Sequence, residues 1–170
     1  MFPFVRMAVM AASLLPPAQA VPATQTTAAA EEAAILDVVD RFMHAVSNND
    51  DAAMAAIRIE GAMNTVARAN GMVTRRAFQP RANASGSGGN QERYWDPIVH
   101  VRGNLAVVWT PYEFWVKGKT SHCGIDAFEL IKEQGVWRIG NAMWTVEPDA
   151  CAALRPSDSS RIRPKSLDPR

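Results

Sequence analysis

The sequence predicts an α+β fold in which N-terminal helices pack against one face of an antiparallel sheet. Apolar residues recur at helical spacing in the first third of the chain, and from residue 93 onward runs rich in valine, isoleucine and aromatics alternate with glycine-containing turns. Helices that precede strands are typical of this class. The 170 residues suffice for one domain, and the net charge of +1 gives no indication of a nucleic-acid partner.

The first twenty residues have the three parts of a secretory signal peptide. Arg6 supplies the positive charge, and the apolar segment "MAVMAASLL" that follows is too short to span a bilayer. Ala18-Gln19-Ala20 fits the small-x-small cleavage pattern. We therefore expect cleavage after Ala20 and a secreted or periplasmic protein. The alternative interpretation is a frayed N-terminal helix.

After a polar linker over residues 21–30, the pattern predicts a helix over 28–47 and a short second helix over 51–57. Glutamates in the first turn favour the longer helix through its dipole. Asn49 or Asp50 can cap the second. The predicted apolar face of the first helix consists of Ile35, Val39, Phe42, Met43 and Val46.

The remainder of the predicted domain, which covers residues 31–151, is built from strands. Asn70-Gly71 indicates a hairpin, and residues 79–92 have the composition of a loop. After residue 151 the proline-, serine- and arginine-rich segment 152–170 predicts a disordered tail. Four long antiparallel strands are expected over residues 94–102, 105–117, 121–132 and 136–147.

Cys123 and Cys151 are the two cysteines of the chain. If the protein is exported, the oxidising compartment permits a disulfide between them. Closing this loop of about 29 residues would stabilise the fold by roughly 3 kcal/mol in the chain-entropy model. We favour the bridge over the alternative of two buried free thiols.

The segment "SHCGIDAFELIK" places His122, Cys123 and Asp126 close together. Side chains alternate along a strand, so His122 and Asp126 share one face and Cys123 points to the other. This geometry argues against a shared metal site and against a Cys-His nucleophile. We predict no metal and no cofactor. Asp126 is then either a general acid or base with a raised pKa in an apolar cavity, or a structural buried polar group.

The turn before this strand decides which residues accompany Asp126. A three-residue turn over Lys117–Lys119 places Tyr112 and Phe114 on its face, with the Tyr112 hydroxyl as a possible hydrogen-bond partner of the acid. We predict this register, which leaves Trp109 and Trp115 on the outer face of the sheet. A two-residue turn would reverse the faces, because a slip of one residue exchanges them, and would bring to Asp126 the side chains of Glu113, Trp109 and Trp115.

Residues 31–151 resemble a nuclear-transport-factor-2-like, or SnoaL-like, domain. The resemblance is carried by "ILDVVDRFMHAVSNND", by "LAVVWTPYEFWVKGKTSHCGIDAFELIK" and by "GVWRI". It implies a cone-shaped curved antiparallel sheet, a cystatin-like α+β roll, around a conical cavity. It also implies a homodimer formed through the outer sheet face, which suits Trp109 and Trp115.

Within this group, Asp126 resembles the oxyanion-hole acid of ketosteroid isomerases, the enzymes that serve as a standard example of pKa tuning. Phe42 stands where those enzymes have a tyrosine, and Val66 stands near the position of their general base. Steroid isomerisation is therefore not predicted. The same comparison implies a cavity wall composed of Phe42, Tyr112, Phe114, His122, Asp126, Phe128 and Trp144.

Three functions remain open at this stage, and the sequence does not decide whether the protein is an enzyme. The first is an exported domain that binds a small apolar or aromatic molecule without chemistry. The second is an isomerase, cyclase, dehydratase or hydrolase that uses Asp126 and His122 as acid and base. The third is an accessory interaction module that dimerises through the outer sheet face.

Overall fold

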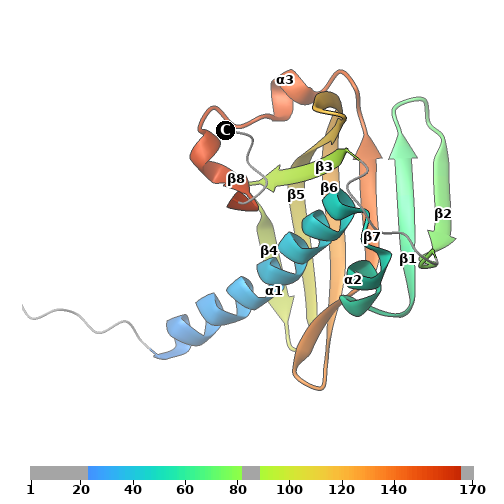
Figure 1. Cartoon of the computed structure of the whole chain (residues 1–170). Coiled ribbons are helices and arrows are strands. Elements are labelled where there is room, and N and C mark those ends of the chain that lie inside the picture. The colour runs from blue at the N-terminus through green and yellow to red at the C-terminus, as the bar shows by residue number, and fades with distance from the viewer. Residues whose placement is uncertain (1–22, 82–88, 166–170) are drawn as a thin grey trace, which may run out of the picture.

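A computed structural model describes residues 23–81 and 89–165, and it confirms the α+β class. A long helix, α1 (Ala23–Asn48), crosses one face of a curved sheet, and α2 (Asp51–Ala56) follows it at the same face (Figure 1). The side chain of Asp50 caps α2 by accepting a hydrogen bond from the Ala53 N–H. No helix in these two segments is long and apolar enough to cross a membrane.

The sheet has the order β2-β1-β7-β6-β5-β3-β8, with β4 also paired to β5. β5, β6 and β7 form the predicted antiparallel meander, whereas β1 and β7 pair in parallel. The predicted hairpin at Asn70-Gly71 joins β1 to β2, and Gly71 has the positive φ that such turns require. The strands are β1 (Arg58–Arg68), β2 (Val73–Ala77), β3 (Asn90–Trp95), β4 (Ile98–Arg102), β5 (Leu105–Val116), β6 (Lys119–Glu133), β7 (Val136–Val146) and β8 (Ile162–Arg163).

The single strand expected over residues 94–102 is wrong. Asp96 has a φ of 48° and Pro97 has no N–H to donate, so the chain breaks there into β3 and β4. Both pieces pair with β5, at opposite ends of that strand. The strand β3 also begins earlier than expected, at Asn90, inside the segment that had the composition of a loop.

The turn between β5 and β6 has two residues, Lys117 and Gly118, both with positive φ. By itself this turn would place the wrong face of β5 beside Asp126. A β-bulge at Ser121 shifts the pairing by one residue, because Trp115 pairs with Thr120 while Phe114 pairs with His122. The predicted face is therefore correct, although the three-residue turn predicted to produce it is wrong.

The hydrophobic core lies between α1 and the inner face of the sheet. The ring of Phe42 on α1 contacts the ring of Phe128 on β6 edge to face, with centroids 5.0 Å apart. This packing uses the helical face that the sequence predicted and the alternate residues of β5, β6 and β7. The main buried contributors are Ile35, Val39, Met43, Val108, Leu130 and Ile139.

The predictions for the two ends of the domain need correction. The helix α1 already begins at Ala23, inside the expected linker 21–30, while the signal peptide expected over 1–20 lies outside the described residues. In the expected disordered tail, residues 151–154 form helix α3, residues 159–161 form a short 3-10 helix, and β8 pairs with β3. Residues 166–170 of that tail also lie outside the described part.

Ion pairs hold this C-terminal segment in place, which composition alone does not reveal. Arg163 on β8 binds Asp40 of α1 at 2.7 Å, and Arg161 binds Asp96 at 2.5 Å. The indole N–H of Trp95 also donates to the Leu154 carbonyl at 2.7 Å. The arginines that suggested a solvated tail therefore have acidic partners in the domain.

A disulfide joins Cys123 on β6 to Cys151 at the start of α3, with Cα atoms 5.0 Å apart. Beside it, Glu113 is fully buried on the outer face of β5 and forms ion pairs with Arg93 and Arg155. Burial raises the pKa of Glu113, but these hydrogen bonds and one from Thr120 outweigh it and bring the pKa to about 2. The two sulfur atoms near Glu113 are oxidised and offer no thiolate to a metal.

Candidate functional site

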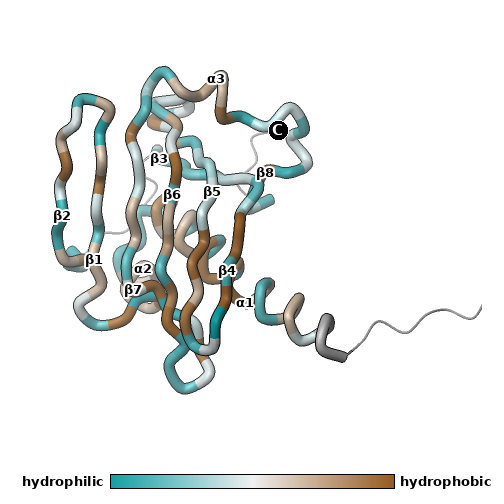
Figure 2. Tube along the Cα trace, turned by 180° about the vertical axis from the view of Figure 1, so that it is seen from behind, coloured by the Kyte–Doolittle hydropathy of each residue, from teal (hydrophilic) through white to brown (hydrophobic). Residues whose placement is uncertain are grey.

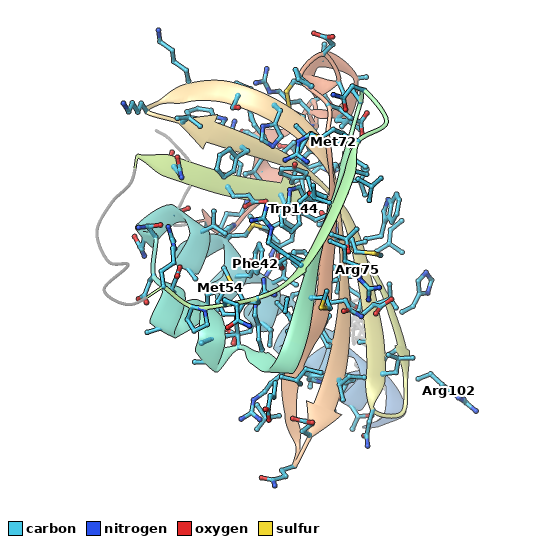
Figure 3. The ribbon with its side chains drawn as sticks, turned by 90° about the vertical axis from the view of Figure 1, so that its right-hand side faces the viewer. Phe42, Met54, Met72, Arg75, Arg102 and Trp144 are labelled. Atoms are coloured by element: carbon cyan, nitrogen blue, oxygen red, sulfur yellow. A yellow bond between two sulfur atoms is a disulfide. The ribbon has the colours of Figure 1, made fainter. Side chains whose placement is uncertain are left out.

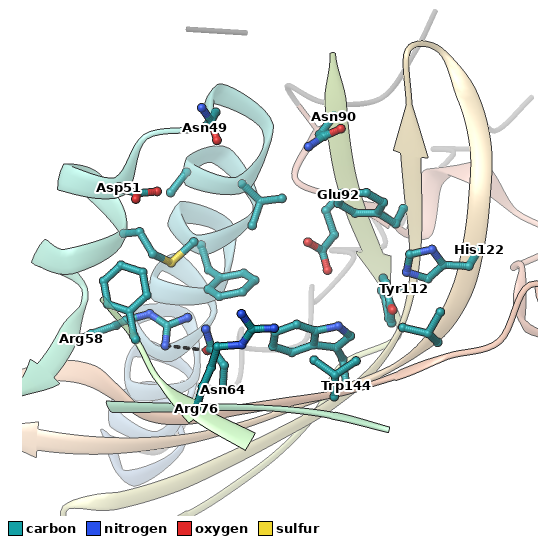
Figure 4. A pocket seen from close by; sticks show the side chains of 18 of the residues that line it. Asn49, Asp51, Arg58, Asn64, Arg76, Asn90, Glu92, Tyr112, His122 and Trp144 are labelled. Atoms are coloured by element: carbon teal, nitrogen blue, oxygen red, sulfur yellow. Dashed lines mark hydrogen bonds between the residues drawn. The ribbon is translucent and has the colours of Figure 1, made fainter. Parts of the chain in front are cut away.

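A pocket of about 570 Å³ lies between the two helices and the inner face of the sheet (Figure 4). Figure 3 shows Phe42, Met54 and Trp144 in this space, whereas Arg102 lies far from it. The helices, β1, β2, β3, β5, β6 and β7 all contribute to the wall. Residues distant in sequence thus meet at one site because the sheet curves around α1.

Five of the seven predicted wall residues line this pocket: Phe42, Tyr112, Phe114, His122 and Trp144. Asp126 and Phe128 are on the predicted face of β6 but do not line it, because other side chains cover them. Phe128 packs under Phe42 in the core. Asp126, with 2% of its surface exposed, lies behind the wall.

Two acids line the pocket, Asp51 and Glu92, and Glu92 on β3 interacts with the carboxyl group of Asp126. Burial raises the pKa of Glu92 to about 7. Burial also raises the pKa of Asp126, and the neighbouring charge and hydrogen bond of Glu92 raise it further. Two buried carboxyl groups in contact cannot both be ionised at low cost, so the pair retains a proton at neutral pH. The Oδ2 atom of Asp126 has no hydrogen-bond partner among the described residues.

Tyr112 and His122 have other partners than the sequence suggested. The Tyr112 hydroxyl donates to the backbone carbonyl of Thr145 at 2.6 Å, and burial raises its pKa. His122 stacks on Phe114, with ring centroids 5.2 Å apart, and its Nδ1 lies 3.1 Å from the Ser121 hydroxyl. Burial lowers the pKa of His122, so the imidazole is neutral at pH 7. The side chain that interacts with Asp126 is therefore that of Glu92, whereas His122 contacts Phe114 and Ser121.

The opposite side of the pocket is basic. Arg58, at the start of β1, is 7% exposed, and its guanidinium lies 4.6 Å from the ring centroid of Phe78 and 5.5 Å from that of Phe42. Its Nη1 donates to Asn64 Oδ1 at 2.9 Å, the interaction dashed in Figure 4. The other arginines in the lining are Arg68, Arg76 and Arg81.

Sequence reasoning missed Glu92 and Arg58. Glu92 follows a serine- and glycine-rich segment whose composition predicts a loop. Arg58 follows the second helix and precedes the hairpin without any motif around it. The one available signal was alternation, since Glu92 and Tyr94 lie two residues apart and share a strand face.

Comparisons with protein-family models and with curated proteins find no match. Solved structures do match. An NTF2-like protein with a cystatin-like fold from Novosphingobium aromaticivorans is 14% identical, with a TM-score of 0.55 over 78% of this chain and 92% of that one. A protein of unknown function with a cystatin-like fold from Nostoc punctiforme is 12% identical, with a TM-score of 0.55 over 71% and 94% of the two chains.

A third match is the association domain of CaMKII from C. elegans, at 14% identity and a TM-score of 0.52, over 69% of this chain and 97% of that one. At these identities the comparisons establish the fold and leave the activity open. The expected cystatin-like, nuclear-transport-factor-2-like fold is confirmed.

The carboxyl pair predicts a pH-dependent stability. The folded chain holds a proton on Glu92 up to a pKa of about 7, whereas the unfolded chain releases it near the ordinary value of 4.5. The free energy of unfolding should therefore fall as the pH rises through this window, by an amount on the order of 3 kcal/mol from this group. Urea unfolding between pH 5 and pH 8 measures it.

Glu92→Gln should remove this contribution, because an amide does not titrate. The exposed Glu60→Gln serves as the matched control and should keep the wild-type slope. Parallel slopes for the wild type and Glu92→Gln would show that folding does not raise the pKa of Glu92.

Proposed function

We propose that this protein binds a small apolar or aromatic molecule in the pocket between α1, α2 and the inner face of the sheet. The supporting observation is the pocket itself, whose volume of about 570 Å³ is in the usual range for small-molecule sites. Phe42, Phe114 and Trp144 provide flat apolar surface. A few polar groups at the ends can orient a ligand, which is the usual composition of such sites.

Export of the protein belongs to this proposal. The disulfide between Cys123 and Cys151 is typical of an oxidising compartment. The N-terminal segment has the composition of a signal peptide, and the proposed cleavage follows Ala20. The ligand would then be bound in the periplasm or outside the cell.

A second candidate function is acid–base catalysis, which the position of Glu92 favours. A carboxyl group with a pKa near 7 that faces an apolar pocket is suited to abstract and return a proton. Asp126 would position Glu92 without contact with the substrate, while burial keeps the pKa of Glu92 high. His122 lines the same pocket and is neutral, so it can accept a hydrogen bond from the ligand.

A homodimer formed through the outer sheet face is the third part of the proposal. Trp109, 50% exposed, pairs with Ile98 on β4 and with Ala127 on β6, and Ala127 pairs with Met143 on β7. This row crosses four strands and presents large apolar side chains to solvent. Figure 2 shows hydrophobic residues along β4 and the neighbouring strands on this side. Trp115 does not join the row, because the Arg93 guanidinium covers its ring at 4.6 Å.

A blocked pocket should not bind ligand. Val146→Trp places an indole in the pocket and should weaken the binding of N-phenyl-1-naphthylamine, a neutral aromatic dye, at least tenfold in a fluorescence titration. Val136→Trp, at an exposed strand position, should leave it unchanged. Equal binding by both variants would place the dye outside the pocket and contradict the proposed function.

Proton abstraction can be measured without knowledge of the natural substrate. The wild type should accelerate exchange of the α-hydrogens of 2-indanone in D₂O, followed by NMR. Glu92→Gln should lower this rate by about 100-fold or more, the usual contribution of a general base. Glu60→Gln is again the control, and an unchanged rate in Glu92→Gln would count against the catalytic candidate.

The dimer predicts a specific effect of one side chain. Trp109→Ser should convert a dimer to a monomer in sedimentation equilibrium while dye binding persists, because the pocket is on the opposite face of the sheet. Val73→Ser, an exposed position on β2, should remain dimeric. A monomeric wild type would refute this interface.

A further inference from the structure

We propose that the pocket takes an organic anion, an aromatic carboxylate whose charged group contacts Arg58 and whose ring lies against the aromatic wall. This inference rests on the proposed binding function and specifies its ligand class. The supporting observation is Arg58, a residue that lines the pocket and is more than nine-tenths buried.

Arg58 has no carboxylate partner among the described residues. Its Nη1 donates a hydrogen bond to the neutral amide oxygen of Asn64, and its buried Nε has no partner in the part of the chain that the structure describes. Buried charges in proteins are normally paired, because an unpaired one loses its hydration without compensation. The pocket next to Arg58 is where a compensating anion can enter.

The acids that line the same pocket are already engaged. Asp51 accepts hydrogen bonds from the Arg81 side chain at 2.8 and 2.9 Å. Glu92 shares a proton with Asp126 and lies across the pocket from Arg58 in Figure 4. Neither carboxyl group serves as the counterion of Arg58.

The aromatic rings around Arg58 hold it ready for a ligand. Phe42 and Phe78 lie against the guanidinium, and cation–π contacts of this kind favour the charged form without neutralising it. Burial lowers the pKa of Arg58 to about 10, so the group is still charged at neutral pH. A planar guanidinium in a fixed orientation suits the two oxygens of a carboxylate.

The wider charge distribution favours the same ligand. Arg68 and Arg76 also line the pocket, and Figure 4 places Arg76 between Arg58 and Trp144. The charge of Arg81 is balanced by Asp51, and the carboxyl pair retains one proton. The net charge of the pocket lining is therefore more positive than that of the whole chain, which is +1. A cavity of one sign attracts small ions of the other.

The test compares 2-naphthoate with its neutral isostere 2-naphthamide as competitors of N-phenyl-1-naphthylamine. Half of the dye bound to the wild type should be displaced by a naphthoate concentration at least tenfold lower than that of naphthamide. A hydrogen bond to a charged group contributes enough free energy for this tenfold difference in affinity. The comparison needs no variant. Equal competition by the two compounds would overturn the inference while leaving the proposed function intact.

Arg58→Met should abolish the preference for naphthoate and keep the apolar contacts. Without ligand, this variant should melt at the same temperature as the wild type or higher, since it removes an uncompensated buried charge. Arg75 is next to Arg76 on β2, but its side chain does not line the pocket, so Arg75→Met should keep the wild-type preference. A naphthoate preference that survives in Arg58→Met would refute the role of this residue. Failure of the dye itself to bind the wild type would refute the proposed function and this inference with it.

Discussion

The register between β5 and β6 determines the site, because it decides which side chains of the sheet face α1. The two-residue turn and the bulge at Ser121 have opposite effects on the face that each residue of β5 presents. Together they place Tyr112 and Phe114 on the inner face of the sheet. Without the bulge, Glu113 and its arginine partners would face the apolar core beneath α1. The same register places Cys123 on the outer side, where it can reach Cys151. Pocket and C-terminal segment therefore depend on one irregularity of strand pairing.

Strand alternation and helical periodicity are sufficient to predict the class, the main helix and the meander, while the aromatic wall follows from the family resemblance. They fail where a long-range partner decides the outcome. Alternation with Tyr94 is the one local feature that separates Glu92 from a loop glutamate, and its partner Asp126 lies on a strand far along the chain. The composition of the C-terminal segment predicts disorder. Its arginines are held in place by Asp40 and Asp96, which are distant in sequence. The break at Asp96-Pro97 had a local signal, since proline weakens a strand assignment.

The pocket has two polar ends that differ in kind. At one end, two carboxyl groups share a proton and reduce their joint charge. At the other, Arg58 retains its charge and is stabilised by rings and one amide. The first arrangement is suited to exchange a proton with a neutral part of a ligand, and the second is suited to hold an anionic part. A ligand that spans both would also contact the aromatic lining, which includes Phe42 and Trp144. Binding and proton transfer are therefore compatible functions of one site. The Tyr112 hydroxyl takes part in neither function, because it donates its hydrogen bond to the Thr145 carbonyl.

A crystal structure of the chain grown with 2-naphthoate would show whether this pocket is a ligand site with two polar ends. We expect naphthalene density against Phe42 and Trp144, with the carboxylate at the Arg58 guanidinium and clear of Glu92. A pocket closed by its own aromatic side chains, or a ligand bound with its carboxylate at Glu92, would contradict it.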